Sequence, residues 1–321
     1  MIAAVCHHER RRKHGKVNGK QRFRCRDCGT TFTDDTLLLG GMRIGIDRAV
    51  QVIHHLVEGT SIRATARLTD TDLKTILDLL VLIGERCKRF LENEISEVYV
   101  DDIQADEVWA PVFCKEKTRK KKGYPEDTGD SWCFTAVERN TKLVVAWHFG
   151  KRTQTDTDLF CERLRDATTG HFQLTTDGFA PYKAAVPILL GGRVDYGMLI
   201  KIFGETTKED QRKYSPATIK AIRKERISGT PDKNRICTSH TERQNGTMRN
   251  FVKRMTRLTY CFSKKWDNHE AALGLYFAFY NFCRVHGSLD GETPAMATGL
   301  TNHVWSIREL LENTAENECN K

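Results

Sequence analysis

Three acidic residues occupy positions at which a carboxylate could take part in chemistry. Asp106 lies in the otherwise apolar stretch IQADEVWA, Asp177 directly follows the strand-like run 172–176, and Glu242 is the single acid among seven Lys and Arg within 239–266. Burying a carboxylate is costly unless it binds a cation or a hydrogen-bond donor. Carboxylate oxygens suit Mg²⁺ or Mn²⁺, and two such ions about 3.5 to 4 Å apart can catalyse phosphodiester chemistry. The three acids are therefore candidate ligands of a two-metal site.

Each acid also has a simpler structural interpretation. Asp106 could lie at a sheet edge or in a salt bridge, and Glu107, which side-chain alternation places on the opposite face of a strand, is the rival candidate. Asp177 before Gly178 is typical of a turn or of a helix N-cap. Glu242 could pair with one of its basic neighbours.

The basic stretch around Glu242 has helical periodicity. On a wheel of about 100° per residue, one apolar stripe lies opposite Glu242, formed by Met248, Phe251, Met255, Leu258 and Phe262. The basic residues share the outward face or its flanks with Glu242. We expect them to contact the phosphates of DNA, and they are Arg243, Arg249, Lys253, Arg254 and Arg257.

The charge of the whole chain favours a polyanionic partner. Its 321 residues include 51 Lys and Arg against 42 Asp and Glu, a formal net charge of +9. Residues 1–28 hold nine basic and two acidic residues, so 9 − 2 = +7 lies at the N-terminal end. A second basic run, KEKTRKKKG, has six basic residues within 115–122 and is either a solvated loop or a phosphate contact.

The cysteines indicate a reducing environment. Of 11 cysteines only Cys25 and Cys28 are closely spaced, and an odd, scattered set argues against a secreted disulfide framework. No apolar run approaches the ~18 residues of a membrane span. We expect a soluble, cytoplasmic protein that does not bind a membrane.

The N-terminal third contains two small patterned segments. RFRCRDCGTTF, residues 22–32, predicts short strands flanking a CxxC turn. A helical stripe over 46–57 is followed by SIRATARL from Ser61, a candidate N-cap, and by a longer helix with Thr69 or Asp70 as its cap. Three helices with tight joints predict a helix-turn-helix, the alternative being a helical linker or a dimerisation bundle.

From residue 97 the pattern is mixed α/β. Strands are expected over 97–113, 131–138 and 142–150, then a helix over 155–168, and strands over 172–176 and 195–203; a polar helix is expected over 208–227, ahead of the basic stretch. This order matches a ribonuclease-H-like mixed sheet with flanking helices, in which the first and fourth strands can lie side by side.

Five motifs resemble a known family. QADEVWAPV, LTTDGFAPY, TSHTERQNGTMR, RLTYCFSKKWDNH and NFCRVHGSLDGETPAMATGL are similar, in order, to motifs of bacterial DDE transposases of the group named after insertion sequence one. The resemblance covers roughly residues 6–311. It implies DNA strand cleavage and transfer at the ends of a mobile element, by a homodimer in the nucleoid that acts on terminal repeats and target DNA with two Mg²⁺ or Mn²⁺ ions.

Matched by motif, Asp106, Asp177 and Glu242 fall on the three catalytic acids of the family. The second interval, 242 − 177 = 65 residues, is long, which predicts an insertion at about 195–238. His286 also matches a family position, and we assign it no catalytic role.

The resemblance also implies a division of the chain. Its parts are a zinc-ribbon-like segment at 1–38, a helix-turn-helix at 44–92, a catalytic domain at 96–290 and a C-terminal tail at 291–321. The candidate zinc ligands are Cys25, Cys28, Cys6 and His8, where the family's first cysteine pair is reduced to Cys6. Three readings stay open: a histidine completes the set, another cysteine lies upstream, or the ribbon binds no metal.

Two other functions share parts of this pattern. A DNA-binding regulator would keep the N-terminal modules on an inactive transposase body. A nuclease or resolvase would use the same metal site but would cut without transferring strands.

Overall fold

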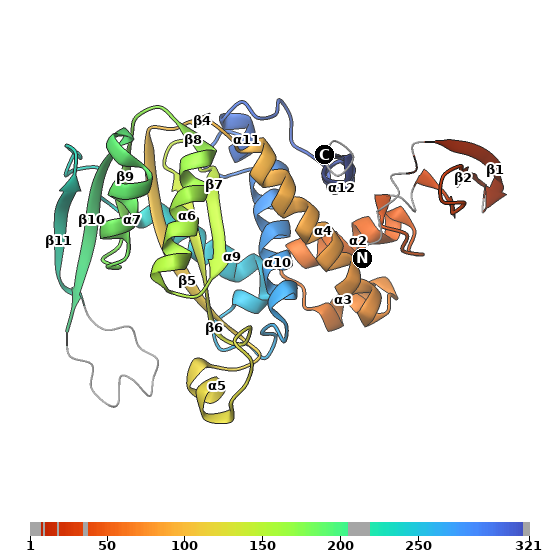
Figure 1. Cartoon of the computed structure of the whole chain (residues 1–321), viewed down its shortest axis with the longest axis horizontal. Helices are drawn as coiled ribbons and strands as arrows, with labels where there is room; N and C mark the ends of the chain where they lie inside the picture. The colour runs from red at the N-terminus through yellow and green to blue at the C-terminus, as the bar shows by residue number, and fades with distance from the viewer. Residues whose placement is uncertain (1–7, 9, 18, 35–37, 205–218, 317–321) are drawn as a thin grey trace.

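The computed structural model describes residues 8, 10–17, 19–34, 38–204 and 219–316 (Figure 1). They form a mixed α/β structure around a six-stranded sheet with helices on both faces. Among the helices of these residues, none has the length and apolar content needed to cross a membrane. Cys6 lies outside the described residues.

The central strand of the main sheet is β5. Its residues are almost all buried, as expected for a strand covered on both faces. It pairs antiparallel with β6 on one side and parallel with β9 on the other. The strand order is β11-β10-β9-β5-β6-β7, with bounds β5 Asp102–Val112, β6 Gly129–Glu138, β7 Val144–Gly150, β9 Phe172–Thr176, β10 Val194–Phe203 and β11 Ile219–Ser228.

Two sets of helices cover this sheet. On one face lie α6, Gln154–Ala167, and α7, Tyr182–Leu189, which pack against each other in front of the strands in Figure 1. On the other face α9, Ser239–Phe251, packs against β5 and β6. Phe160 of α6 contacts Phe134 of β6 with ring centroids 5.6 Å apart, one of many apolar contacts that close this face.

A small three-stranded antiparallel sheet lies at the N-terminal end, at the opposite side of the molecule from β11 (Figure 1). Its strands are β1 Arg11–Val17, β2 Lys20–Cys25 and β3 Thr31–Phe32. The CxxC turn separates β2 from β3, as the sequence predicts, and β1 is an additional strand on the other side of β2.

Three helices follow: α2 Ile46–Val57, α3 Ile62–Thr69 and α4 Leu73–Glu94. Ser61 caps α3 as expected, because its side chain accepts a hydrogen bond from the Ala64 N–H. The predicted cap of α4 is wrong. Asp70 ends α3 in the left-handed conformation with φ 46°, and Asp72 accepts the N–H groups of Lys74 and Thr75.

The long helix α4 also joins the N-terminal helices to the rest of the chain. It packs against α10, Trp266–Ala278, and against α12, Ile307–Glu316, whose Leu310 and Leu311 are fully buried. The residues predicted as a C-terminal tail therefore include a packed helix. The short elements are β4 Val98–Tyr99, β8 Thr168–Thr169, α5 Glu116–Lys122, α11 Pro294–Ala297 and the single turns at 191–193, 253–255 and 279–283.

The helix predicted over 208–227 is wrong in its described part. Residues 205–218 lie outside the description, and Ile219–Ser228 form β11, which pairs antiparallel with β10. The segment IKAIRKERIS is rich in helix-forming Lys, Arg and Glu. Pairing with the edge of the sheet overrides that weak local preference.

Gly84→Ala should destabilise the fold. A Cβ at position 84 would lie 2.1 Å from the Ala271 carbonyl oxygen where α4 crosses α10, so the backbones would have to separate. Overpacking of this kind costs about 1 to 3 kcal/mol of unfolding free energy. The urea midpoint should fall accordingly, whereas Gly246→Ala, in α9 with open space around it, should keep or raise it. An unchanged midpoint for Gly84→Ala would argue against this crossing.

Candidate metal site on the central sheet

Asp106, Glu107 and Asp177 come together at the end of β9. One carboxylate oxygen of each lies within 4.8 Å of the others. The pairing of the strands produces this arrangement, because β9 runs parallel to β5 as far as the pair Ala105 and Thr176. Asp177 therefore leaves the sheet beside Asp106, although the two are 71 positions apart (177 − 106).

The two neighbouring acids of β5 approach Asp177 from opposite faces of the sheet. Asp106 faces α9, where the Asn245 side chain donates a 2.8 Å hydrogen bond to its Oδ2. Glu107 faces α7, where the Tyr182 hydroxyl lies beside it. The expected alternation is present, but it does not remove Glu107 from the site. Asp177 follows the last residue of its strand and can be reached from both faces.

Asp177 is both a turn residue and a member of the acidic cluster, the two roles that the sequence allows. Its Oδ1 accepts a 2.9 Å hydrogen bond from the Phe179 N–H, as an aspartate in a turn does. Its Oδ2 lies 3.8 Å from the Arg152 guanidinium. The turn thus fixes the carboxylate in the cluster.

Burial and mutual repulsion make these acids hard to ionise. Burial, followed by the charge of Asp177, raises the pKa of Asp106 to about 7 and the pKa of Glu107 to about 8. Carboxylates in such a group favour either protons or a bound cation.

The cluster fits a divalent cation. Asn245 Oδ1, beside Asp106, is buried and has no hydrogen-bond partner among the described residues. Glu107 Oε1 is buried without a hydrogen bond of normal geometry, the Tyr182 hydroxyl being the donor beside this carboxylate. Unpaired buried oxygens are rare in proteins, and a hard cation would satisfy them. The residues that could hold Mg²⁺ or Mn²⁺ here are Asp106, Glu107 and Asp177.

Glu242, the third predicted ligand, lies outside this group. Its carboxylate accepts hydrogen bonds from the Lys201 ammonium group and, at 2.6 Å, from Thr238 Oγ1. Burial acts to raise the pKa of Glu242, but these hydrogen bonds outweigh it and lower the pKa. Glu242 is still near enough for its charge to raise the pKa of Asp106.

The continuous helix expected through the basic stretch is wrong. Helix α9 ends at Phe251, and Val252 is extended, with φ −101° and ψ 94°. Leu258, which was predicted in the apolar stripe, is 73% exposed. The buried residues of α9 are mainly polar: Thr241, Gln244, Asn245 and Met248. Gln244 donates to the Tyr276 hydroxyl of α10, and Asn245 donates to Asp106 of β5.

The five predicted phosphate contacts therefore differ in their surroundings. Arg254 turns inward, donates to Ser263 Oγ at 2.9 Å and to the Asn268 carbonyl, and so supports the loop rather than facing solvent. Arg249 is half-buried close to Asp106, whose charge acts on it. The other three are exposed on the surface: Arg243, Lys253 and Arg257.

Arg152 is a site residue that the sequence reasoning missed. Its guanidinium lies between two aromatic rings, 4.6 Å from the Trp132 centroid and 4.1 Å from the Phe179 centroid, and donates a 3.0 Å hydrogen bond to Glu107 Oε2. Its only sequence signal is a basic residue just after a strand, which is too common to single it out.

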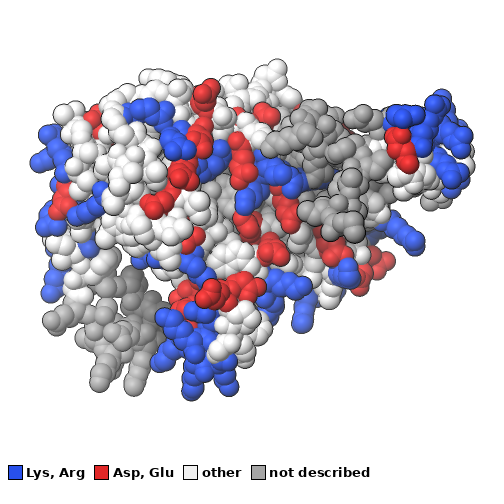
Figure 2. Space-filling model, viewed as in Figure 1, with Lys and Arg blue, Asp and Glu red and all other residues white. Residues whose placement is uncertain are grey.

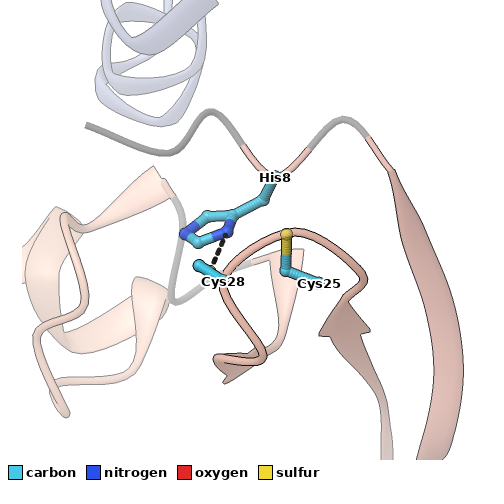
Figure 3. A group of neighbouring side chains, drawn as sticks. All are labelled: His8, Cys25 and Cys28. Carbon is cyan, nitrogen blue, oxygen red and sulfur yellow. Dashed lines mark hydrogen bonds between the residues drawn. The ribbon is translucent and has the colours of Figure 1, made fainter. Parts of the chain in front are cut away.

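A second cluster of metal-ligand types lies in the N-terminal sheet. His8, Cys25 and Cys28 each offer one ligand atom within 4.8 Å of the others, with His8 Nδ1 3.3 Å from Cys28 Sγ (Figure 3). Three ligands of these types fit zinc, which takes four in a structural site. Cys6, the fourth predicted ligand, lies outside the described residues.

A scan against protein-family models and a search of curated proteins find no match to this chain. Its function is therefore argued from its own residues.

Asp106→Asn should stabilise the protein at pH 8 in the presence of a chelator. The pKa of Asp106 is raised to about 7 in the folded state, so its charge costs folding free energy above that pH. The cost declines as the pH falls through the folded pKa towards the unfolded value near 4. We expect a gain on the order of 1 kcal/mol at pH 8 and a smaller one at pH 5, measured by urea unfolding.

Asp102→Asn is the matched control on the same strand. Asp102 is fully buried and paired with Arg139 at 3.1 Å and Arg235 at 3.0 Å. This variant should lose stability at both pH values, because it leaves Arg139 without its charge partner and Arg235 with Asp101 alone. A loss of stability in Asp106→Asn at pH 8 would contradict the raised pKa of Asp106.

Proposed function

We propose that this chain is a metal-dependent DNA transposase with a ribonuclease-H-like catalytic domain. The observation that carries the proposal is the meeting of Asp106 and Asp177 across the parallel pair of β5 and β9. The order of the strands supports the proposed fold, because β5 and β9, the first and fourth strands of the six-stranded sheet in chain order, lie side by side.

The proposed reaction is cleavage of a DNA strand at an element end, followed by transfer of the freed 3′ end to target DNA. Two divalent ions, when bound, would activate the attacking oxygen and stabilise the leaving oxygen. Asp106 and Asp177 would hold them, and Glu242 stays a predicted ligand whose side chain must move towards the cluster to take part. The product joins two ends, which is why we expect a homodimer.

Basic surfaces of the chain would hold the DNA. Figure 2 shows Lys and Arg gathered over α5 and over the N-terminal sheet. The exposed Arg243, Lys253 and Arg257 add to the charge near α9. Phosphate contacts of this kind supply affinity without reading sequence.

The N-terminal parts would recognise the element ends. We propose that residues 1–38 are a zinc ribbon, held by His8, Cys25 and Cys28 with Cys6, and that α2, α3 and α4 include a helix-turn-helix. The alternative function, a DNA-binding regulator on an inactive body, is favoured by one observation: the Glu242 carboxylate is bound by Lys201 and Thr238 instead of meeting the other acids.

Cleavage of labelled DNA tests the proposal. The substrate carries the sequences that flank the gene, the cation is Mn²⁺, and the variants are Asp106→Ala, Asp177→Ala and Glu242→Ala. We expect each variant to retain DNA binding and to lose cleavage by roughly 100-fold or more, because the charge stabilisation of the transition state is lost.

The products of the cleavage assay, or their absence, distinguish the candidate functions. Joined strands support a transposase, whereas cut but unjoined strands indicate a nuclease. Specific binding without cleavage by the wild-type protein would favour the regulator. Full cleavage by Glu242→Ala would remove Glu242 from the ligand set.

Replacing the lysines of α5 should weaken DNA binding in a salt-dependent way. Lys120, Lys121 and Lys122 lie in the last turn of this exposed helix. Their triple replacement by Ala should reduce the slope of log affinity against log salt by roughly 1 to 3, because fewer counterions are released. Arg165→Ala, an exposed base paired with Asp166 on α6, should leave the slope unchanged. Equal slopes for the two variants would exclude α5 from the interface.

A further inference from the structure

Glu107 has the features of a metal ligand, although it is not one of the three acids predicted from the sequence. It is only 8% exposed, it lies in the acidic cluster, and its buried Oε1 has no hydrogen bond of normal geometry among the described residues. We propose that Glu107 binds the same cation as Asp106 and Asp177, so that the DNA-free protein holds this ion without Glu242. The inference deepens the proposed function and rests on it for the role of the ion.

The unpaired atoms around the cluster support a ligand at this point. The Tyr182 hydroxyl is fully buried beside Glu107 and acts on that carboxylate as a hydrogen-bond donor, although without normal geometry. Asn245 Oδ1, on the opposite face, is buried and has no hydrogen-bond partner among the residues described. Such a buried oxygen would otherwise carry the full cost of losing water. A hydrated cation would supply both an electrostatic partner and water donors.

The spacing of the oxygens is close to that of a bound ion. Two oxygens that bind Mg²⁺ at about 2.0 to 2.1 Å each lie at most about 4.2 Å apart. The three carboxylates lie within 4.8 Å of one another. Small side-chain rotations would therefore bring them into the coordination shell without moving the strands.

Arg152 leaves one oxygen of Glu107 available. The guanidinium donates to Oε2 at 3.0 Å, and Oε1 is buried without a hydrogen bond of normal geometry. Stacking between Trp132 and Phe179 limits where the guanidinium can lie. Glu107 is thus a buried acid of the cluster with one oxygen held by a fixed partner.

Glu242 is less suited to this role in the DNA-free protein. Its side chain is 47% exposed, outside the cluster, and its carboxylate is bound by Lys201 and Thr238. Lys201 and Thr238 both bind Oε1, and the carboxylate lies outside the cluster, so the Glu242 side chain would have to move to reach the ion. Glu107 already lies in the cluster.

Calorimetric titration of Mn²⁺ into the purified full chain, without DNA, tests the inference. Glu107→Gln keeps the size of the side chain and removes its charge, so we expect its affinity for Mn²⁺ to fall roughly tenfold or more, as in Asp106→Asn. Glu242→Gln should stay within about twofold of the wild type, as should Asp102→Asn, the matched buried acid of β5.

Wild-type affinity in Glu107→Gln, with affinity lost in Asp106→Asn, would overturn the inference and leave Glu107 as the ion-pair partner of Arg152. A tenfold loss in Glu242→Gln would overturn it as well. If Glu107→Gln does not fold, Glu107→Asp keeps the charge and draws the carboxylate back by about 1.5 Å. Unchanged Mn²⁺ affinity in that variant would also count against direct binding.

The result of the Mn²⁺ titration does not depend on whether the protein cleaves DNA. If the wild type binds Mn²⁺ through these acids but does not cut DNA, the ligand set stands and the transposase proposal fails. If the wild type binds no Mn²⁺ at millimolar concentration, the ligand set fails whatever the cleavage assay shows.

Discussion

The parallel pairing of β9 with β5 is the constraint on which the rest of the site depends. β9 has only five residues, and its register places Thr176 opposite Ala105. A slip of one residue would turn every side chain of β9 to the other face of the sheet and would separate Asp177 from the acids of β5. All five side chains of β9 are buried between the helices on the two faces of the sheet, so a slip would pack each of them against the wrong neighbours. The acidic cluster is thus a consequence of packing in the core.

Charge repulsion within the cluster is balanced by positive groups from several elements. Arg152 follows β7 and pairs with Glu107, while Arg249 of α9 lies near Asp106. Each base reaches the site from a different face of the sheet. Even so, burial and then the charge of Asp177 keep the pKa values of Asp106 and Glu107 raised. A divalent cation would stabilise the ionised carboxylates in place of the protons. The close crossing of α4 and α10 and a large apolar core stabilise the fold, and this offsets the cost of burying the acidic cluster.

Local patterns predicted the strands well where burial reinforces them. The strand predicted over 172–176 is present with the same bounds, and Ser61 caps its helix as expected. Prediction failed where distant contacts decide the structure. Ile219–Ser228 looks helical from its composition but pairs with an edge strand. The helix from Ser239 looks continuous on a wheel, but the chain turns at Val252 and directs Arg254 into contacts with Ser263 and Asn268.

The sequence by itself determined which carboxylates stand near strand ends, and that is why Asp106 and Asp177 could be named. Only the tertiary structure decided which other residues join them. Glu107 enters the cluster from the opposite face, Arg152 comes from a strand end 45 positions away (152 − 107), and Glu242 binds Lys201 instead. The physical reason is that periodicity reports which face of an element a residue occupies. It carries no information about which other element packs on that face, and this depends on strand order and helix packing across the whole chain.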